Sequence, residues 1–508
     1  MKTDGAYAAF KAVAGLMAIC VVCASHASAQ SDSSSDVLKG LKAPSSPERP
    51  WLPPDMTGFA GVIKAKGEPE ADPQKDYDLA ELIDLAERAN PETKVAWEQA
   101  RQSAAAVGIA QSEYYPLLAL RATADYVRQP VPVPVSATTA SYLDLRTEQA
   151  QPVAALEWVL LDFGRRKSGV LAAKNQLLAA NLGFNARHQE IVFNVQSAFY
   201  EYCKARGRID VAQSALNSAL NVQQAVEERY KNGLATAPDV SQAQQQAASA
   251  TFDLQDVLAK ERDAQVVLAE TIGITPTVPL HVVDFSKLPV PTNLEDSVEQ
   301  VIDRTLKQRP DLLAQVALLR EKEAKIRQAR SAYYPTLAFE GTAGGSFDNA
   351  QMKFLDHELP SSYTQQPVWG VGLTLSWSLF DGGARKHKLE LARAEREATQ
   401  HALENSRDKA VSQVWRAYTD TRLAISRLDV AAALVNASDK SYQQTFEAYQ
   451  NGLSSLVDVL AARRELSQAR YTQLDTRATL LESTAALAFT SGDLGPQLLK
   501  RTTWKREN

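Results

Sequence analysis

Short stretches of this chain alternate strictly between apolar and polar positions, which is the pattern of a β-strand with one apolar face. The apolar side of the first stretch comprises Leu118, Leu120, Ala122, Ala124 and Tyr126. Arg121 and Asp125 lie on its polar side. A second stretch places Trp158 on the apolar side and Glu157 on the polar side. Together they predict a β-hairpin over about residues 117–161.

Another pair of alternating stretches occurs later in the chain. Glu340 lies on the polar side of the first of them, and Trp369 and Trp377 lie on the apolar side of the second. We therefore expect a second β-hairpin over about residues 336–380. A Tyr-Tyr-Pro sequence precedes each hairpin, and its proline ends the helical pattern that comes before.

Long segments without proline follow each hairpin and are rich in Ala, Gln, Leu, Glu, Arg and Lys, all good helix formers. Each predicts a helix of almost 70 residues, or about 100 Å. Asp162 and Asp381 are the expected N-caps of these helices. Asn232-Gly233 and Asn451-Gly452 are the expected ends, after which a second helix returns. Each β-hairpin is therefore expected to continue into a helical hairpin.

The chain is duplicated internally with a constant offset of 219 residues. Tyr114-Tyr115-Pro116 corresponds to Tyr333-Tyr334-Pro335, and Trp158 corresponds to Trp377. The period is much longer than that of a solenoid, so this is one duplicated unit. The expected domains are repeat 1 at 77–274, a linker at 275–294, repeat 2 at 295–493 and a tail at 494–508.

The N-terminal part has a different character. A basic start, an apolar segment and Ala27-Ser28-Ala29 predict a signal peptide over residues 1–29. The alternative is a lipoprotein signal that ends at Cys20 or Cys23. Residues 30–76 are rich in proline and form either a flexible tether or an extended strap on a partner surface.

Composition excludes several classes of protein. With 23 glycines and 7% aromatic residues among 508, the chain has too few of both for an all-β porin. No apolar run has the length of a transmembrane helix. The net charge of −5, with acids and bases interspersed, lacks the basic surface of a nucleic-acid-binding protein. No metal-ligand spacing, nucleotide-binding loop or nucleophile motif occurs, so we expect no metal, no cofactor and no enzymatic activity.

The apolar strand faces indicate a membrane. Four strands in one chain cannot close into a barrel, so closure requires several chains. Two chains would supply eight strands, a barrel filled by its own side chains, and three would supply twelve, wide enough for a pore. The residues expected to anchor the sheet in lipid are Tyr126, Trp158, Trp369 and Trp377. Those expected to face a water-filled lumen are Arg121, Asp125, Glu157 and Glu340. The alternatives are tryptophans that only pack in a core, and a sheet that covers a soluble core.

The order of these features resembles the TolC family of outer membrane efflux proteins over residues 77–495. The features that carry the resemblance are the duplication and three pairs of sequences. These are the two Tyr-Tyr-Pro sequences, the equivalent segments Leu161 to Arg166 and Phe380 to Arg385, and the two Tyr-x-Asn-Gly-Leu sequences. The resemblance implies a mainly α-helical homotrimer with a shared twelve-stranded β-barrel and a periplasmic barrel of long coiled-coil helices. Phe163 stands where the family commonly has glycine, which we expect to alter only the turn from strand to helix.

The resemblance also assigns roles to the turns between long helices. It implies that a periplasmic adaptor docks on Asn232-Gly233-Leu234 and on Asn451-Gly452-Leu453, although each glycine could simply end a helix. Asp239 and Asp458 are placed to close capping boxes with Thr236 and Ser455. Three-fold symmetry would also make each of them a ring of three carboxylates at the tunnel mouth. Such a ring would hold the gate shut or select ions by charge.

The function that follows is a passive conduit across the periplasm and the outer membrane of a Gram-negative bacterium. Energy would come from an inner-membrane pump, joined through a periplasmic adaptor whose docking opens the channel. The cargo, whether drugs, metals, proteins or polysaccharide, would be selected by the pump. The alternative function is that of a structural periplasmic coiled-coil or adaptor protein.

Overall fold

The computed structural model describes residues 71–72, 74–136, 139–277, 280–283, 288–294, 296–354 and 357–494. The expected signal peptide (1–29), Cys20, Cys23, most of the proline-rich extension and all of the tail except Leu494 lie outside the described residues. The described chain forms two compact units. One contains the sheet in residues 109–169 and 327–389, and the other contains most of the helical residues.

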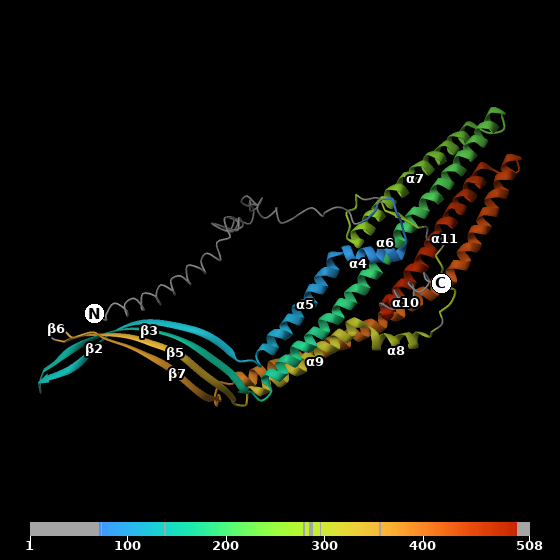
Figure 1. Ribbon diagram of the computed structural model, residues 1–508. Coiled ribbons are helices and arrows are strands. Elements are labelled where there is room, and N and C mark those ends of the chain that lie inside the picture. Colours follow the sequence, from blue (N-terminus) through green and yellow to red (C-terminus); the bar gives the residue numbers. More distant parts are fainter. Residues whose placement is uncertain are drawn as a thin grey trace, which may run out of the picture. The chain divides into compact units, whose positions relative to one another are not determined.

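The sheet unit is an antiparallel sheet with four long strands (Figure 1). These are β2 (Leu117–Ser136), β3 (Thr139–Leu161), β5 (Thr336–Phe354) and β7 (Ser362–Ser376), which lie side by side in that order. The short β6 (His357–Glu358) pairs with the end of β5. β7 ends at Ser376, so Trp377 lies just beyond the strand in which the alternation had placed it.

The strand register brings the apolar sides of the two predicted hairpins onto one face. One row across the four strands consists of Leu120, Ala154, Ala343 and Trp369. A neighbouring row contains Trp158, Phe339 and Leu373. Because side chains alternate along a strand, this register also unites the polar positions on the opposite face. The duplicated hairpins therefore form one sheet with two chemically different sides.

The long helices confirm the expected duplicated helical hairpins. In repeat 1 they are α6 (Arg165–Lys231) and α7 (Ala237–Ile272), and in repeat 2 they are α10 (Ala384–Gln450) and α11 (Leu456–Ser491). The first helix of each pair has 67 residues, or about 100 Å. Within the described parts of the chain, no helix is both apolar and long enough to cross a membrane.

The start of each long helix differs from the expectation in two ways. Asp162 lies three residues before α6 and is not its N-cap, although its carboxylate accepts hydrogen bonds from the N–H groups of Gly164 and Arg166. Asp381 does the same for Gly383 and Arg385. Phe163 has a positive φ of 49° and stacks on Tyr334, at 5.1 Å between ring centroids. The expectation that Phe163 alters only the turn is therefore wrong, because its ring also contacts the other repeat.

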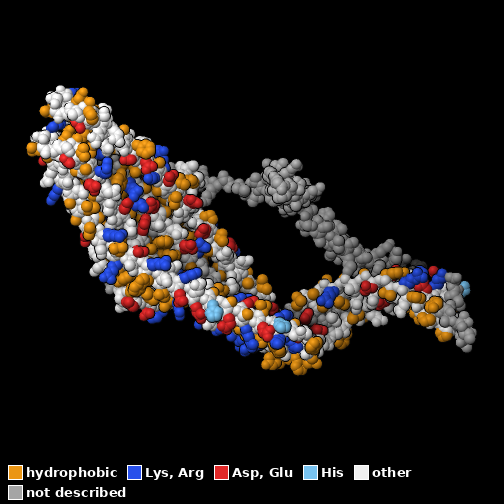
Figure 2. Space-filling model, turned by 180° about the vertical axis from the view of Figure 1, so that it is seen from behind, with side chains coloured by type: hydrophobic (Ala, Val, Ile, Leu, Met, Phe, Trp, Pro, Cys, Tyr) orange, Lys and Arg blue, Asp and Glu red, His pale blue; other side chains and the backbone are white. Residues whose placement is uncertain are grey.

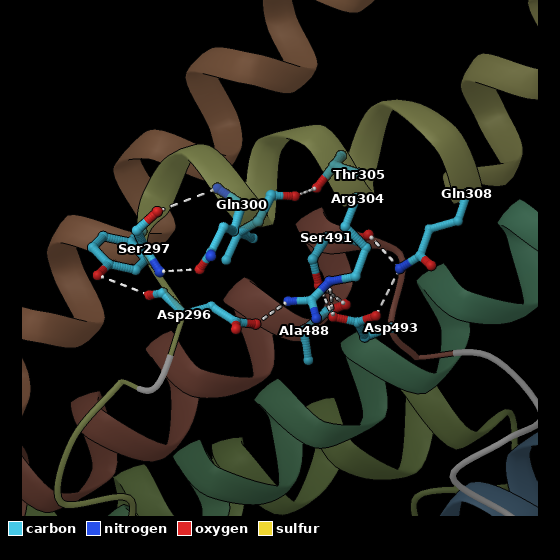
Figure 3. A network of polar contacts seen from close by, with 11 residues as sticks. Asp296, Ser297, Gln300, Arg304, Thr305, Gln308, Ala488, Ser491 and Asp493 are labelled. Atoms are coloured by element: carbon cyan, nitrogen blue, oxygen red, sulfur yellow. Dashed lines mark hydrogen bonds and ion pairs between the residues drawn. The ribbon is translucent and has the colours of Figure 1, made fainter.

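Shorter helices precede each sheet hairpin and are also duplicated. They are α4 (Leu79–Ala89) and α5 (Pro91–Ser112) in repeat 1, and α8 (Val298–Gln308) and α9 (Pro310–Ser331) in repeat 2. Figure 3 shows how α8 meets the end of α11: Gln308 donates to the Ser491 carbonyl and, at 2.7 Å, to Asp493. The first of these bonds satisfies a backbone carbonyl that the end of α11 leaves without a helical partner.

The main apolar core of the helical unit lies where α4 packs against the long helices. It contains Leu82 of α4, Phe199 of α6, Leu268 of α7 and Leu481 of α11. Beside it, β1 (Asp76–Tyr77) pairs in parallel with β4 (His281–Val282), and Tyr77 and Val282 are part of the same core. This core joins helices of both repeats.

Candidate functional site

The apolar face of the sheet is uncovered. Leu120 is 81% exposed, Trp369 76% and Leu375 66%. Figure 2 shows apolar side chains on the surface of the sheet, gathered most densely where the strands meet the long helices. Exposed apolar area of this extent marks a surface that lipid or protein covers in the working state.

The two tryptophans at the helix-proximal end of the sheet have satisfied indole groups. Trp158 Nε1 donates to the Tyr114 carbonyl at 2.9 Å, and Trp377 Nε1 donates to the Tyr333 carbonyl at 3.2 Å. Both rings remain exposed, as does the Tyr126 ring further along β2. An aromatic ring with its polar group bonded and its apolar body exposed suits a membrane–water interface. The anchoring role of these residues and of Trp369 stays a prediction.

The four residues expected to face a lumen lie together on the polar side of the sheet. Arg121 and Asp125 are opposite Val153 and Gln149, and Glu157 is directly opposite Glu340. Two carboxylates opposite each other repel, so this pair requires water nearby. The register therefore places them on one face, whereas their position in a lumen stays a prediction.

The two turns between long helices have the same geometry. Gly233 and Gly452 both have a φ of 75°, which a residue with a side chain rarely adopts. Leu234 N donates to the Arg229 carbonyl, and Leu453 N donates to the Ala448 carbonyl, both at 2.8 Å. These bonds are those of a Schellman helix end, so each glycine does end a helix.

The side chains on these turns differ in what they offer to a partner. Leu234 is 65% exposed and Leu453 84%. Asn232 and Asn451 instead bond their own helices, through the Glu228 and Glu447 carbonyls. The leucines are thus the groups available for an apolar contact, and adaptor docking there stays a prediction.

Asp239 and Asp458 close the expected capping boxes, which confirms that interpretation. The Asp239 carboxylate accepts from Thr236 N at 2.8 Å and from its hydroxyl at 2.7 Å. Asp458 accepts from Ser455 in the same way. These hydrogen bonds lower the pKa of both carboxyl groups, which keeps them charged near neutral pH. Nothing in the protomer tests the proposed gate or selectivity ring.

Arg229 is a tip residue that sequence reasoning missed. Its Nη1 donates to the carbonyls of Tyr449 and Gln450 at 2.8 and 3.0 Å, and its guanidinium lies over the Tyr449 ring. A cation at the C-terminal end of α10 also suits the helix dipole. The available signal was a departure from the duplication, since repeat 2 has Ala448 at the corresponding position.

Arginines of α11 were missed as well. Arg463, Arg470 and Arg477 are spaced by seven residues and so share one side of the helix. Arg463 is buried and donates to the Ala215 carbonyl and to Gln246, and Arg470 donates to Ser214 and Asp439. Burial lowers the pKa of Arg463. This row connects α11 to α6 and α7 of repeat 1 and to α10 of its own repeat.

Among the described residues, no group of three or more His, Cys, Asp and Glu side chains is arranged to hold a metal ion. The candidate functional surfaces are the two-sided sheet and the two helix tips. Both are built from repeated elements, and neither has the geometry of a closed catalytic pocket.

Comparison with known proteins agrees with this geometry. The model of the family described as outer membrane efflux protein matches residues 82–274 and 301–493, two segments that are themselves offset by 219. Protein CyaE of Bordetella pertussis is 26% identical over 446 residues, which cover 87% of this chain and 90% of that protein. Outer membrane protein OprJ of Pseudomonas aeruginosa is 26% identical over 389 residues, which cover 77% and 78%.

Solved structures share the fold. The outer-membrane channel OprN aligns with a TM-score of 0.70 and 20% identity, over 84% of this chain and 94% of that one. The Campylobacter jejuni CmeC outer membrane channel aligns with a TM-score of 0.69 and 18% identity, over 91% and 97%. A family of efflux proteins is also consistent with a chain that is not an enzyme. The match over both repeats establishes that this chain belongs to the outer membrane efflux protein family.

Proposed function

We propose that three copies of this outer membrane efflux protein form one passive conduit across the periplasm and the outer membrane. The β-hairpins would combine into a twelve-stranded barrel in the membrane, and the long helices would form a tunnel below it. The proposed modules are a signal peptide (1–29), an extension (30–76), repeat 1 (77–274), a linker (275–294), repeat 2 (295–493) and a tail (494–508).

The observation that carries this proposal is the sheet. It has one apolar and one polar face, and within the described strands the outer edges of β2 and β7 have no partner. Unpaired strand edges cannot remain in lipid, because nothing there satisfies backbone N–H and C=O groups. Closure with other copies removes these edges, leaves the apolar face to lipid and encloses the polar face as a lumen.

The lipid-facing and lumen-facing roles follow from closure. Tyr126, Trp158, Trp369 and Trp377 would anchor the barrel at lipid and its interfaces. Arg121, Asp125, Glu157 and Glu340 would line the water-filled interior, where the opposed carboxylates stay hydrated. Their charges would influence which solutes pass, whereas the choice of cargo would belong to the pump.

The names of relatives support tripartite assembly. TtgC of Pseudomonas putida, 23% identical over 413 residues, is named a toluene efflux pump outer membrane protein. We propose that a periplasmic adaptor joins this chain to an inner-membrane pump by docking on Asn232-Gly233-Leu234 and Asn451-Gly452-Leu453. Exposed Leu234 and Leu453 would contact the apolar side of an adaptor helix.

Asp239 and Asp458 would each form a three-fold ring near the tunnel mouth. Their lowered pKa keeps these rings charged, so they would repel anions and attract cations. Arg229 would help hold the mouth closed, since it bonds the end of the other hairpin of its own chain. The alternative of a structural periplasmic coiled-coil or adaptor protein does not account for membership in an outer membrane family.

The test is the native mass of the detergent-extracted protein from outer membranes washed with high salt and carbonate. We expect a particle of three chains that stays with the membrane. A monomer released by the wash would overturn the conduit.

Docking has its own test. A photo-crosslinking side chain at position 234 or 453 should capture a periplasmic adaptor in cells, and one at Val95, exposed on α5, should not. Equal capture from all three positions would contradict docking at the tips.

A further inference from the structure

Several contacts that lie within one repeat occur twice in this chain. Asn90 donates to the Thr271 carbonyl at 2.9 Å, and Arg309, which is 219 residues later, donates to the Thr490 carbonyl at 3.3 Å. Asp162 with Arg166, and Asp381 with Arg385, form a second such pair of ion pairs. The offset therefore relates contacts as well as residues.

One of the contacts between the repeats joins α6 to α11 (Figure 1), and its equivalent by the offset does not occur within the described protomer. Arg208 of α6 forms a bidentate ion pair with Asp475 of α11, with Nη2 2.7 Å from Oδ2. The Arg208 guanidinium also lies 5.9 Å from the centre of the Tyr471 ring. Further along the same two helices, Phe193 of α6 stacks on Phe489 of α11 at 4.8 Å between centroids.

Applying the offset to this contact gives a second set of residues with the same chemistry. Arg208 corresponds to Arg427 of α10, Asp475 to Asp256 of α7, and Tyr471 to Phe252 of α7. A cation, an anion and an aromatic ring are thus all present twice. In the observed contact Arg208 is on α6 and Asp475 is on α11. The equivalent contact would therefore join α10, which carries Arg427, to α7, which carries Asp256.

Within the described protomer these three residues do not meet. Arg427 is exposed and forms no ion pair there, and Asp256 is paired only with Lys260 of its own helix. The Phe252 ring is 73% exposed. Other apolar side chains on the same two helices are also exposed, among them Val267 of α7 and Val430 of α10.

Other residues of the α6–α11 contact differ from their equivalents on α10 and α7. The equivalent residues match in size in one pair and are more polar in both. A methyl-sized group at Gly207 would come within 2.7 Å of Leu474, so a residue without a side chain faces a large one. The corresponding pair is Ser426 and Gln255, again small against large but polar. The stacked pair Phe193 and Phe489 corresponds to Ser412 and Glu270. The α10–α7 surfaces are thus more polar than the α6–α11 contact.

We propose that α10 of one copy packs against α7 of a second copy, and that Arg427 forms an ion pair there with Asp256 of the partner subunit. In the same contact Arg427 lies over the ring of the partner's Phe252. Such a contact is heterologous, and repeating it closes a ring of three copies. The inference rests on the proposed three-chain conduit and names the contact that holds its helical part together.

The test is chemical crosslinking of the full-length chain in isolated outer membranes. In the double variant Arg427→Cys with Asp256→Cys, a short bismaleimide should join chains covalently, giving dimers and trimers on a denaturing gel. The matched control is Arg208→Cys with Asp475→Cys, which should be linked within one chain and run as a monomer. The parent chain, whose described Cys203 is buried, should give no crosslink.

The outcomes separate this inference from the conduit itself. A native trimer without interchain crosslinks at 427 and 256 would overturn the contact and leave the conduit standing. A native monomer would overturn both. Interchain crosslinks from the 208 and 475 control would also contradict the assignment, because they would place that pair at a subunit boundary.

Charge exchange provides an independent measurement. Arg427→Asp should reduce the fraction of trimer by native mass, because two carboxylates then oppose each other. Adding Asp256→Arg should restore the trimer fraction of the parent chain. A double variant no better than Arg427→Asp alone would overturn the pairing.

Discussion

The helices of the two repeats have the same lengths, whereas the residues at which the repeats meet each other differ. Phe163 and Gly382 occupy equivalent positions, with φ values of 49° and 64°. Phe163 stacks on Tyr334 of the other repeat, whereas Gly382 has no side chain to place against the equivalent Tyr115, which is 73% exposed. Arg229 and Ala448 differ in the same way at the opposite end of the helices. The duplication therefore accounts for the shared elements, and residues that differ between the repeats make the contacts that occur only on one side.

The largest expected effect concerns the sheet, where repeat 2 has Gly344 and repeat 1 has Asp125. A Cβ at 344 would lie 2.1 Å from the Pro152 carbonyl oxygen and 2.8 Å from Val153 Cα. Because these are backbone atoms, Gly344→Ala should destabilise the sheet by about 3 kcal/mol, the upper end for overpacking. The measurement is the temperature at which the folded barrel is lost on gels. Gly372→Ala, which meets nothing within 4 Å, is the control and should leave that temperature unchanged.

Next is the asymmetric tip. Arg229→Ala removes charged hydrogen bonds to Tyr449 and Gln450, and so should loosen the end of α10 by about 1.5–3 kcal/mol. Hydrogen exchange at residues 451–453 should accelerate, and channel conductance in a planar bilayer should rise. Lys231→Ala is the matched control. Unchanged exchange in Arg229→Ala would show that the two tips are not joined by this residue.

The capping boxes at the starts of α7 and α11 are equivalent in the two repeats, so removing either one should destabilise the protein by the same amount. Thr236→Ala and Ser455→Ala each remove a cap, which should cost about 1 kcal/mol at the start of α7 and α11. Thermal unfolding of the two variants is the measurement. A clear difference between them would mean that the two tips have different surroundings in the assembly.

Two substitutions of Phe163 distinguish the effect of its backbone strain from the effect of its ring stacking. Phe163→Ala keeps the left-handed conformation and loses the ring contact, so it should destabilise the protein by about 1 kcal/mol. Phe163→Gly also relieves the strain and should be closer to the parent chain in thermal unfolding. If both variants unfold at the same temperature, the strain at this turn is negligible.

The smallest expected effect is a pH dependence confined to repeat 1. His188 Nε2 lies 3.1 Å from Glu87, and this contact raises the pKa of His188. A raised pKa means that the stabilisation is complete below the unfolded value, about pH 6.5, and is lost as the pH rises through the folded value. Repeat 2 has Arg407 at the equivalent position, which stays charged.

We expect a difference of a few tenths of a kcal/mol between pH 5.5 and 8 in thermal unfolding. His188→Gln should remove this difference, since glutamine does not titrate in that range. A pH dependence that persists in the variant would have to arise from other groups.

Much of the fold could be predicted because the relevant signals are periodic. Alternation at Leu118 to Tyr126 placed an apolar strand face, and the strand register bears it out. The Asn-Gly sequences located the ends of α6 and α10 to within two residues. The error at Trp377, which lies beyond β7, arose because alternation continues past the last ladder hydrogen bond. The error at Asp162 arose because its carboxylate caps the helix from three residues away.

The candidate site was predictable only in part. The tip glycines and the capping aspartates are local in sequence, and the structure has the local geometry expected of them. Arg229 acts on carbonyls about 220 residues away, and no local pattern encodes that partner. Its departure from the duplication was the one available clue.

The sequence by itself determined the duplicated elements, because strand alternation, helix composition and turn residues act over a few positions. It also determined which residues share a face within each strand, since that depends only on the alternation of side chains along the strand. Only the tertiary structure decided which helices meet, namely α6 with α11 through Arg208 and Asp475. The physical reason is that equivalent surfaces of the two repeats carry the same charges, so sequence alone leaves the choice of partner open. Packing within one chain resolves that choice once and leaves Arg427 and Asp256 exposed for a second copy.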